Sequence, residues 1–273
     1  MATRIDAAPA LAATDRVSAA ASARLGRVPV AIVVAIVLAW AVAVAAEVGG
    51  VAHYVHHDTL LEGGPPFWLA LFAFLLAWQL MIAAMMLPSS LPLVRLFASA
   101  SVGQPRPGAA MAGFLGGYAL VWSAFGALAL GFDLGVHRSV DSIGWLHDNQ
   151  WLIGGSVLAV AGAFQFTKLK DACLEKCRHP GQFMMRYYER GAVGGFRLGA
   201  RHGAFCVGCC WALMLVMFAA GVASLVWMTL LTALMVHEKT RPAGRRAVPG
   251  TGVTLLAMSS IVLLYSAYAA GAI

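Results

Sequence analysis

Long uncharged, apolar stretches alternate with short polar segments along almost the whole chain after its first 27 residues. The stretches cover residues 29–46, 67–94, 107–132, 149–167, 203–236 and 247–273. A helix needs about 20 mostly apolar residues to cross the hydrocarbon core of a bilayer, which is roughly 30 Å thick. The pattern therefore predicts an all-α protein, a polytopic bundle of transmembrane helices embedded in a lipid bilayer.

The stretch 203–236 is too long for one span, because as a single helix it would measure about 50 Å. A hairpin near Gly221 divides it into two helices and gives seven helices in total; a single tilted helix gives six. The placement of Lys and Arg favours the hairpin. With it, and with a cytoplasmic N-terminus, 18 of the 19 basic residues lie on the cytoplasmic side, leaving only Arg138 outside. The positive-inside rule predicts such an asymmetry.

Three regions follow from this topology. Residues 1–27 are rich in alanine with scattered arginines, which predicts a disordered cytoplasmic tail. Residues 28–273 form the transmembrane domain. Within it, residues 168–204 combine Phe, Met and Tyr with Lys, Arg and Gly, a mixture typical of a segment that lies in the membrane interface on the cytoplasmic side.

Composition agrees with a membrane protein. Apolar residues make up 60% of the chain and charged residues only 11%, whereas soluble domains carry about 25% charged residues. The net charge of +7 comes from residues spread between the apolar stretches, so it indicates topology and no nucleic-acid partner. The sequence holds no serine-hydrolase pattern, phosphate loop or dinucleotide fingerprint, and we expect no enzyme.

The five cysteines fall into two groups. Cys206, Cys209 and Cys210 occupy positions i, i+3 and i+4 at the start of the fifth stretch, and His202 lies four residues upstream. These spacings place the side chains on one face of a helix, including that of His202 if the helix begins early. The other group, Cys173 and Cys177, follows the fourth stretch.

Both groups are predicted at the same side of the membrane, so all five thiols can converge at one depth. Cytosolic thiols stay reduced, which favours metal binding or redox chemistry over structural disulfides. Any one cysteine is more simply explained as a buried packing residue. Chance clustering of all five is harder to accept, and we interpret them as metal ligands.

Methionines lie at the same predicted depth. Met85 and Met86 end the second stretch in MIAAMMLPSSLP, where Pro88 and Pro92 are expected to break the helix. Thiolate and thioether ligands together favour Cu(I) over harder ions. Zinc remains an alternative, although the cysteine spacings differ from the paired knuckles of structural zinc sites.

The outward-facing segments have a different chemistry. Residues 47–66 and 133–148 together hold five of the eight histidines and six of the twelve acidic residues. Polar loops explain this composition most simply. A low-affinity capture site for a cation is the functional alternative, because imidazole and carboxylate groups suit divalent metals.

Three segments carry a resemblance to a known family: AMMLPSSLPLV, GAFQFTKLKDACLEKCRHP and RHGAFCVGCCWALMLVMFAAGVASLVWM. They resemble the bacterial family of predicted metal-binding integral membrane proteins, formerly a domain of unknown function, some members of which are labelled copper chaperones. The resemblance covers roughly residues 65–240 and excludes the tail and the first histidine-bearing segment. It implies metal-binding roles for Cys173, Cys177, Cys206, Cys209 and Cys210, with His202, Met85 and Met86 nearby.

The leading hypothesis is a protein of the bacterial inner membrane that holds Cu(I) near the cytoplasmic face, for delivery to or assembly of a copper enzyme. Its partners would be a membrane copper enzyme or a copper donor protein. A membrane thiol–disulfide redox protein is the first alternative. A structural assembly subunit with packing cysteines is the second. No charged residue is expected in the middle of a span, which disfavours a coupled transporter.

Overall fold

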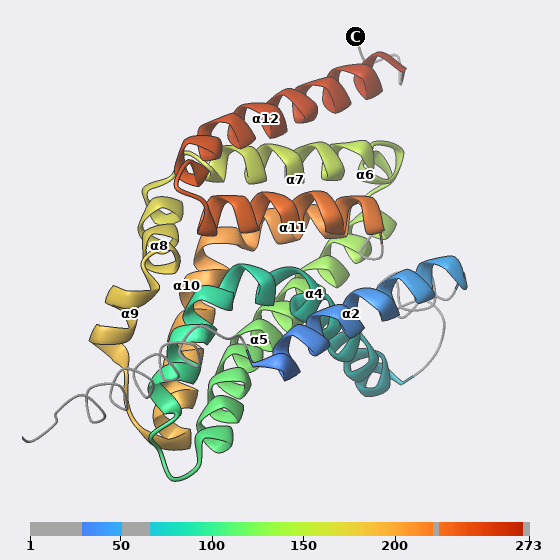
Figure 1. Ribbon diagram of the computed structural model, residues 1–273. Coiled ribbons are helices and arrows are strands. Elements are labelled where there is room, and N and C mark those ends of the chain that lie inside the picture. The colour runs from blue at the N-terminus through green and yellow to red at the C-terminus, as the bar shows by residue number, and fades with distance from the viewer. Residues whose placement is uncertain (1–28, 51–65, 221–223, 270–273) are drawn as a thin grey trace, which may run out of the picture.

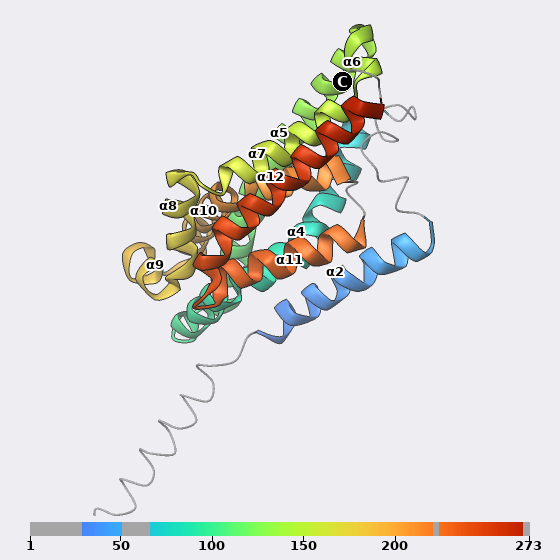
Figure 2. The ribbon, with the colours of Figure 1, turned by 90° about the horizontal axis from the view of Figure 1, so that it is seen from above.

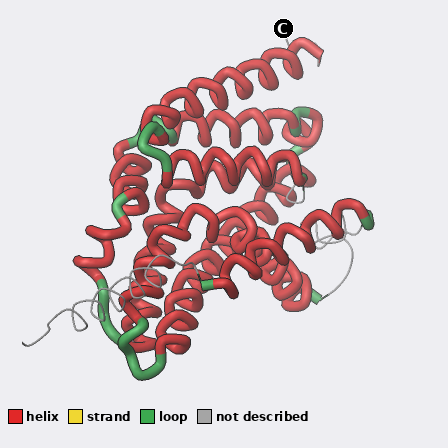
Figure 3. The backbone as a smooth tube through the Cα atoms, viewed as in Figure 1, coloured by secondary structure: helices red, strands yellow, loops and turns green. Residues whose placement is uncertain are grey.

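The computed structural model describes residues 29–50, 66–220 and 224–269. Over these residues the chain is helical and has no strand, as the hydrophobic pattern predicts, and short loops join the helices (Figure 3). The helices are α2 (Val30–Val48), α4 (Phe67–Ser101), α5 (Pro107–Ser142), α6 (Gly144–Asp148), α7 (Trp151–Phe164), α8 (Lys168–Arg178), α9 (Pro180–Tyr187), α10 (Gly191–Ala220), α11 (Leu225–Thr240) and α12 (Gly244–Ala269).

Among the described residues, five helices, or six with one bent pair, are long and apolar enough to cross a membrane, against the seven predicted and the six of the alternative. Five of the described helices are long and apolar enough alone: α2, α4, α5, α10 and α12. The sixth candidate is α7 together with α8, which are bent by 66° at their junction. The remaining expected span, α11, has only 16 residues, or about 24 Å, which is short of the bilayer core.

The division of the long fifth stretch is confirmed. Helix α10 ends at Ala220 and α11 begins at Leu225. Helix α11 runs back towards the middle of α10, because Lys239 near the end of α11 reaches Cys206. Gly221, the predicted position of the hairpin, lies outside the described residues. Helix α10 also begins earlier than expected, at Gly191, inside the segment predicted to lie in the interface.

The prolines of α4 kink this helix without ending it, contrary to expectation. The helix continues through Pro88 and Pro92 and changes direction near its middle (Figure 1). A proline has no N–H, so the carbonyl of Ala84, four residues before Pro88, loses its partner within the helix. The indole Nε1 of Trp40 in α2 donates to that oxygen at 3.0 Å and replaces the missing bond.

Glycines allow α5 and α10 to lie against each other almost backbone to backbone, side by side in Figure 1. A Cβ added at Gly117 of α5 would lie 2.8 Å from the Ala200 nitrogen, and one at Gly199 of α10 would overlap the Phe114 carbonyl. Small residues permit this approach in membrane helices, where no hydrophobic force drives helices together. The contact fixes which residues of α5 face the cysteines of α10.

The remaining helices surround this pair. Helix α2 lies at one edge against α4 and α11, and α12 packs on α7 and α11 on the other side (Figure 2). Helices α8 and α9 form one end of the bundle and contact α10 and α4 (Figure 1). The predicted tail and most of the first histidine-bearing segment lie outside the described residues.

Candidate metal centre

Three cysteines share one buried face of α10. Cys206, Cys209 and Cys210 are each at most 1% exposed. The Cys209 and Cys210 thiols both donate to the backbone carbonyl of Cys206, at 3.1 and 2.8 Å. The i, i+3, i+4 spacing therefore has the expected effect, and the three sulfur atoms point into the interior of the bundle.

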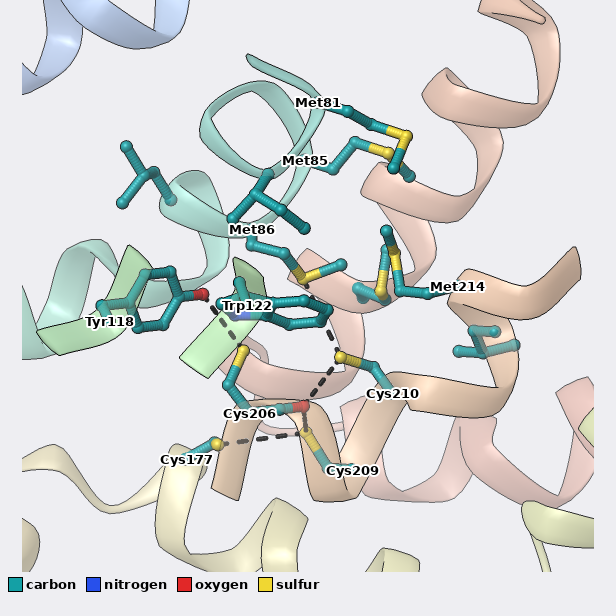
Figure 4. Packing of buried hydrophobic residues seen from close by; sticks show 14 of the residues in the cluster. Met81, Met85, Met86, Tyr118, Trp122, Cys177, Cys206, Cys209, Cys210 and Met214 are labelled. Carbon is teal, nitrogen blue, oxygen red and sulfur yellow. Dashed lines mark hydrogen bonds between the residues drawn. The ribbon is translucent and has the colours of Figure 1, made fainter. Parts of the chain in front are cut away.

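Helix α8 brings a fourth thiol to this face. Thr167 caps the start of α8 by accepting a hydrogen bond from the Lys170 N–H at 3.2 Å, and the bend after α7 directs α8 along α10. The Cys177 sulfur then lies 3.9 Å from that of Cys209 (Figure 4). Cys173, one turn earlier, packs against Gly208, whose missing side chain leaves room for its sulfur.

Helix α4 supplies a thioether. The Met86 sulfur lies 3.8 Å from the Cys210 sulfur, and the Ser89 hydroxyl donates to the Met86 carbonyl at 2.8 Å. Met85 is equally buried but lies beside Met81, one turn away on the same helix (Figure 4). We call the group Met86, Cys177, Cys206, Cys209 and Cys210 the sulfur cluster.

A buried lysine joins the sulfur cluster from α11. The Lys239 ammonium lies 3.1 Å from the Cys206 sulfur and 3.9 Å from that of Cys210. It is also 3.9 Å from the Met86 sulfur and 3.2 Å from the Ser89 hydroxyl oxygen. In the sequence Lys239 lies three residues after an apolar stretch, which indicated a basic residue in a loop. Its place beside the sulfur atoms depends on how α11 packs on α10.

A hydrogen-bonded chain links the cluster to His202. The Tyr118 hydroxyl is 3.2 Å from the Cys206 sulfur and 3.4 Å from the Ser90 hydroxyl. Ser90 is in turn 3.1 Å from His202 Nε2, and the imidazole stacks on the Tyr118 ring. His202 therefore supports the cluster through two side chains and does not touch its sulfur atoms.

A second buried lysine holds α8 against α11. Lys170 is paired with Glu238 at 2.7 Å, and both side chains are at most 2% exposed. Arg178 adds hydrogen bonds to the carbonyls of Glu238, Arg241 and Pro242. Lys170 belongs to the segment 168–204 predicted to lie in the membrane interface, whereas the structure buries it in an ion pair that ties the helix of Cys177 to that of Lys239.

The Cys177 and Cys209 sulfur atoms, 3.9 Å apart, are close enough for one ion to bind both at the usual metal–thiolate distance of about 2.3 Å. Among the described residues, no three His, Cys, Asp or Glu side chains are placed to hold one ion together. Structural zinc needs four such ligands, so this geometry gives the zinc alternative no support.

The second histidine-bearing segment shows local contacts of its two histidines. It is largely helical, as the end of α5 and as α6. His137 Nδ1 lies 3.0 Å from the Asp133 carbonyl oxygen one turn back, and His147 Nδ1 lies 3.7 Å from the neighbouring Asp148 carboxylate. The cation-capture hypothesis gains no site among these described residues, and His53, His56 and His57 lie outside them.

Of the eight residues proposed as ligands, the structure brings Met86, Cys177, Cys206, Cys209 and Cys210 together. Cys173, Met85 and His202 lie around them. Tyr118, Ser90 and Lys239 were missed. Polar groups inside membrane spans are costly and often functional. The Tyr118 hydroxyl within the stretch 107–132, and Ser90 in the Ser-Ser pair after the methionines, could have been recognised on this ground.

Comparison with known proteins identifies the family. No characterised protein and no solved structure matches the chain. A family model described as PpoB2, copper chaperone, matches residues 75–262, which is more than half of the chain and includes every residue of the sulfur cluster. The tail and the first histidine-bearing segment lie outside the match, as the resemblance of the three sequence segments implied. The chain belongs to the PpoB2 family of copper chaperones.

Proposed function

We propose that the chain holds Cu(I) at the sulfur cluster, within a bacterial inner membrane, and passes it on to a copper enzyme. The observation that carries the proposal is the meeting of four thiols and one thioether from α4, α8 and α10 in a buried space. Thiolate and thioether donors select Cu(I). The family description, copper chaperone, supports the same ion and a carrier role without catalysis.

One member of the cluster lies at an end of the bundle, which suits loading and release. Cys177 belongs to α8, which together with α9 forms that end (Figure 1). In the topology favoured by the positive-inside rule this end faces the cytoplasm. A donor or acceptor protein on that side would reach copper without crossing the bilayer.

Copper retention by the purified protein tests the proposal. The protein in detergent is loaded anaerobically with Cu(I), excess ion is removed with a chelator, and the copper retained per chain is measured. Wild-type protein should retain stoichiometric copper with sulfur ligands in its X-ray absorption spectrum. The triple variant Cys206→Ser, Cys209→Ser, Cys210→Ser should retain none. Cys173→Ser is the matched control, because this thiol packs against Gly208 outside the cluster.

The same geometry supports one competing function, thiol–disulfide exchange between Cys177 and Cys209. Their sulfurs are 3.9 Å apart, whereas a disulfide bond is about 2.05 Å long, so a modest approach of α8 to α10 would close it. The two thiols would lose two electrons and two protons to an added disulfide such as oxidised glutathione, which is reduced to two thiols. Mass spectrometry of alkylated peptides after this treatment decides: both cysteines remaining reduced excludes the redox function.

A further inference from the structure

The two buried lysines of the protein have different partners. Lys170 is neutralised by the Glu238 carboxylate at 2.7 Å. Within the described chain no carboxylate pairs with Lys239, which is 5% exposed and contacts only the Ser89 hydroxyl, the Met86 thioether and two thiols. A buried ammonium needs a negative partner, because desolvating an unpaired charge is very costly.

The groups that touch Lys239 and can carry a negative charge are the thiols of Cys206 and Cys210. Both are buried beyond the reach of solvent ions, at 0% and 1% exposure. The ammonium therefore lies where it balances the charge of thiolates, among three of the sulfur atoms that would surround an ion. Ser89 holds the ammonium from the side of α4 at 3.2 Å.

We propose that Lys239 is the charge-balancing residue of the centre and that it makes the centre selective for monovalent soft ions over divalent ones. The proposal rests on the proposed function, since it concerns the same sulfur cluster. One monovalent ion with two thiolates carries a charge of −1, which the ammonium cancels. One divalent ion with two thiolates is already neutral, so the ammonium leaves an uncompensated positive charge in a buried site.

A third thiolate bound to the same ion would cancel that charge. The cluster has four thiols, but no three cysteine, histidine or acidic side chains of the described residues are placed to hold one ion together. The selectivity therefore follows from the net charge of the ion, the thiolates bound to it and the Lys239 ammonium. Replacing Lys239 with a neutral residue should reverse it.

Metal competition measures the reversal. Dissociation constants of the purified full-length protein are determined for Cu(I) and Ag(I) as monovalent probes and for Cd(II) as a divalent probe. Lys239→Met should weaken Cu(I) and Ag(I) binding by about 10- to 100-fold, the usual effect of losing a residue that supports metal ligands, and should strengthen Cd(II) binding. Lys239→Arg keeps the charge and should restore the preference for monovalent ions.

A control variant separates the role of Lys239 from a general loss of positive charge. Lys168→Met removes the charge of an exposed lysine at the start of α8, and should leave the ratio of Ag(I) to Cd(II) affinity unchanged. Gel-filtration profiles and melting temperatures verify folding, and Lys239→Gln replaces Lys239→Met if the latter aggregates.

The outcomes distinguish this inference from the proposed function. An unchanged ratio in the neutral Lys239 variants, or an equal loss in Lys239→Arg, overturns the role of Lys239 while copper retention by the wild type stands. A wild type that binds Ag(I) with the expected dependence on Lys239 but retains no Cu(I) overturns the copper function alone. A wild type that binds none of the three ions overturns both.

Discussion

Two parts of this chain are rich in metal-ligating side chains, and the fold places them in contrasting surroundings. The sulfur cluster draws its members from α4, α8 and α10 and is almost fully buried. The segment 133–148 holds two histidines and three acidic residues, yet His147 and Asp148 are 64% and 80% exposed. His137 contacts the Asp133 carbonyl oxygen one turn back, and His147 contacts the neighbouring Asp148 carboxylate.

The difference shows that ligand-type residues close in sequence do not make a site by themselves. An exposed carboxylate or imidazole is well solvated, so it gains little free energy when it replaces its water contacts with a weakly bound ion. Buried thiols from separate helices are held in position by the packing of the whole bundle, and metal binding then gains from that pre-organisation. The predictions below test this contrast.

The largest effect is expected from removing a central thiol. Cys206→Ser should lower Cu(I) affinity by more than about 100-fold, beyond the range for residues that only support ligands, because its sulfur adjoins both Tyr118 and Lys239. The double variant His137→Ala, His147→Ala should leave the affinity unchanged. Competition with a chromophoric Cu(I) chelator measures both, and a comparable loss in the histidine variant would remove the contrast between the two regions.

The next effect concerns the packing that positions the cluster. Gly117→Ala places a methyl group against the backbone of α10 and should destabilise the protein by about 1–3 kcal/mol, with weaker copper retention. Gly116→Ala is the matched control on the same helix, because a Cβ there meets open space. Thermal unfolding in detergent measures the difference, and equal melting temperatures would show that the α5–α10 contact is looser than described.

A smaller effect separates the two adjacent methionines. Met86→Leu removes the thioether near Cys210 and should weaken Cu(I) binding about tenfold, equivalent to about 1.4 kcal/mol. Met85→Leu keeps volume and burial at the neighbouring position and should have no effect on affinity. Equal affinities for the two variants would limit the cluster to its thiols.

The smallest effect is expected at the kink of α4. Trp40→Phe removes the donor to the Ala84 carbonyl and should cost about 0.5–1.5 kcal/mol of stability without changing the metal preference. Trp68→Phe, at a side chain 69% exposed, is the control. Melting temperatures test this, and an unchanged value for Trp40→Phe would mean that another donor replaces the indole.

Much of the fold could be predicted from the apolar stretches, because a bilayer requires long helices whose backbone bonds are satisfied internally. The break between α10 and α11 also followed from length and charge. The number of spans could not be predicted in this way, since α7 and α11 are shorter than their apolar stretches suggested. The continuity of α4 depended on a partner from α2, the Trp40 indole, which no local pattern reveals.

The candidate site divides in the same way. The sequence by itself determined the shared face of Cys206, Cys209 and Cys210, because helical spacing is a local property. Only the tertiary structure selected Cys177 over Cys173, chose Met86 over Met85 and placed Lys239 among the sulfur atoms. Those choices depend on how helices distant in sequence pack, through the glycines of α5 and α10 and the fold-back of α11, and no periodicity within one segment encodes them.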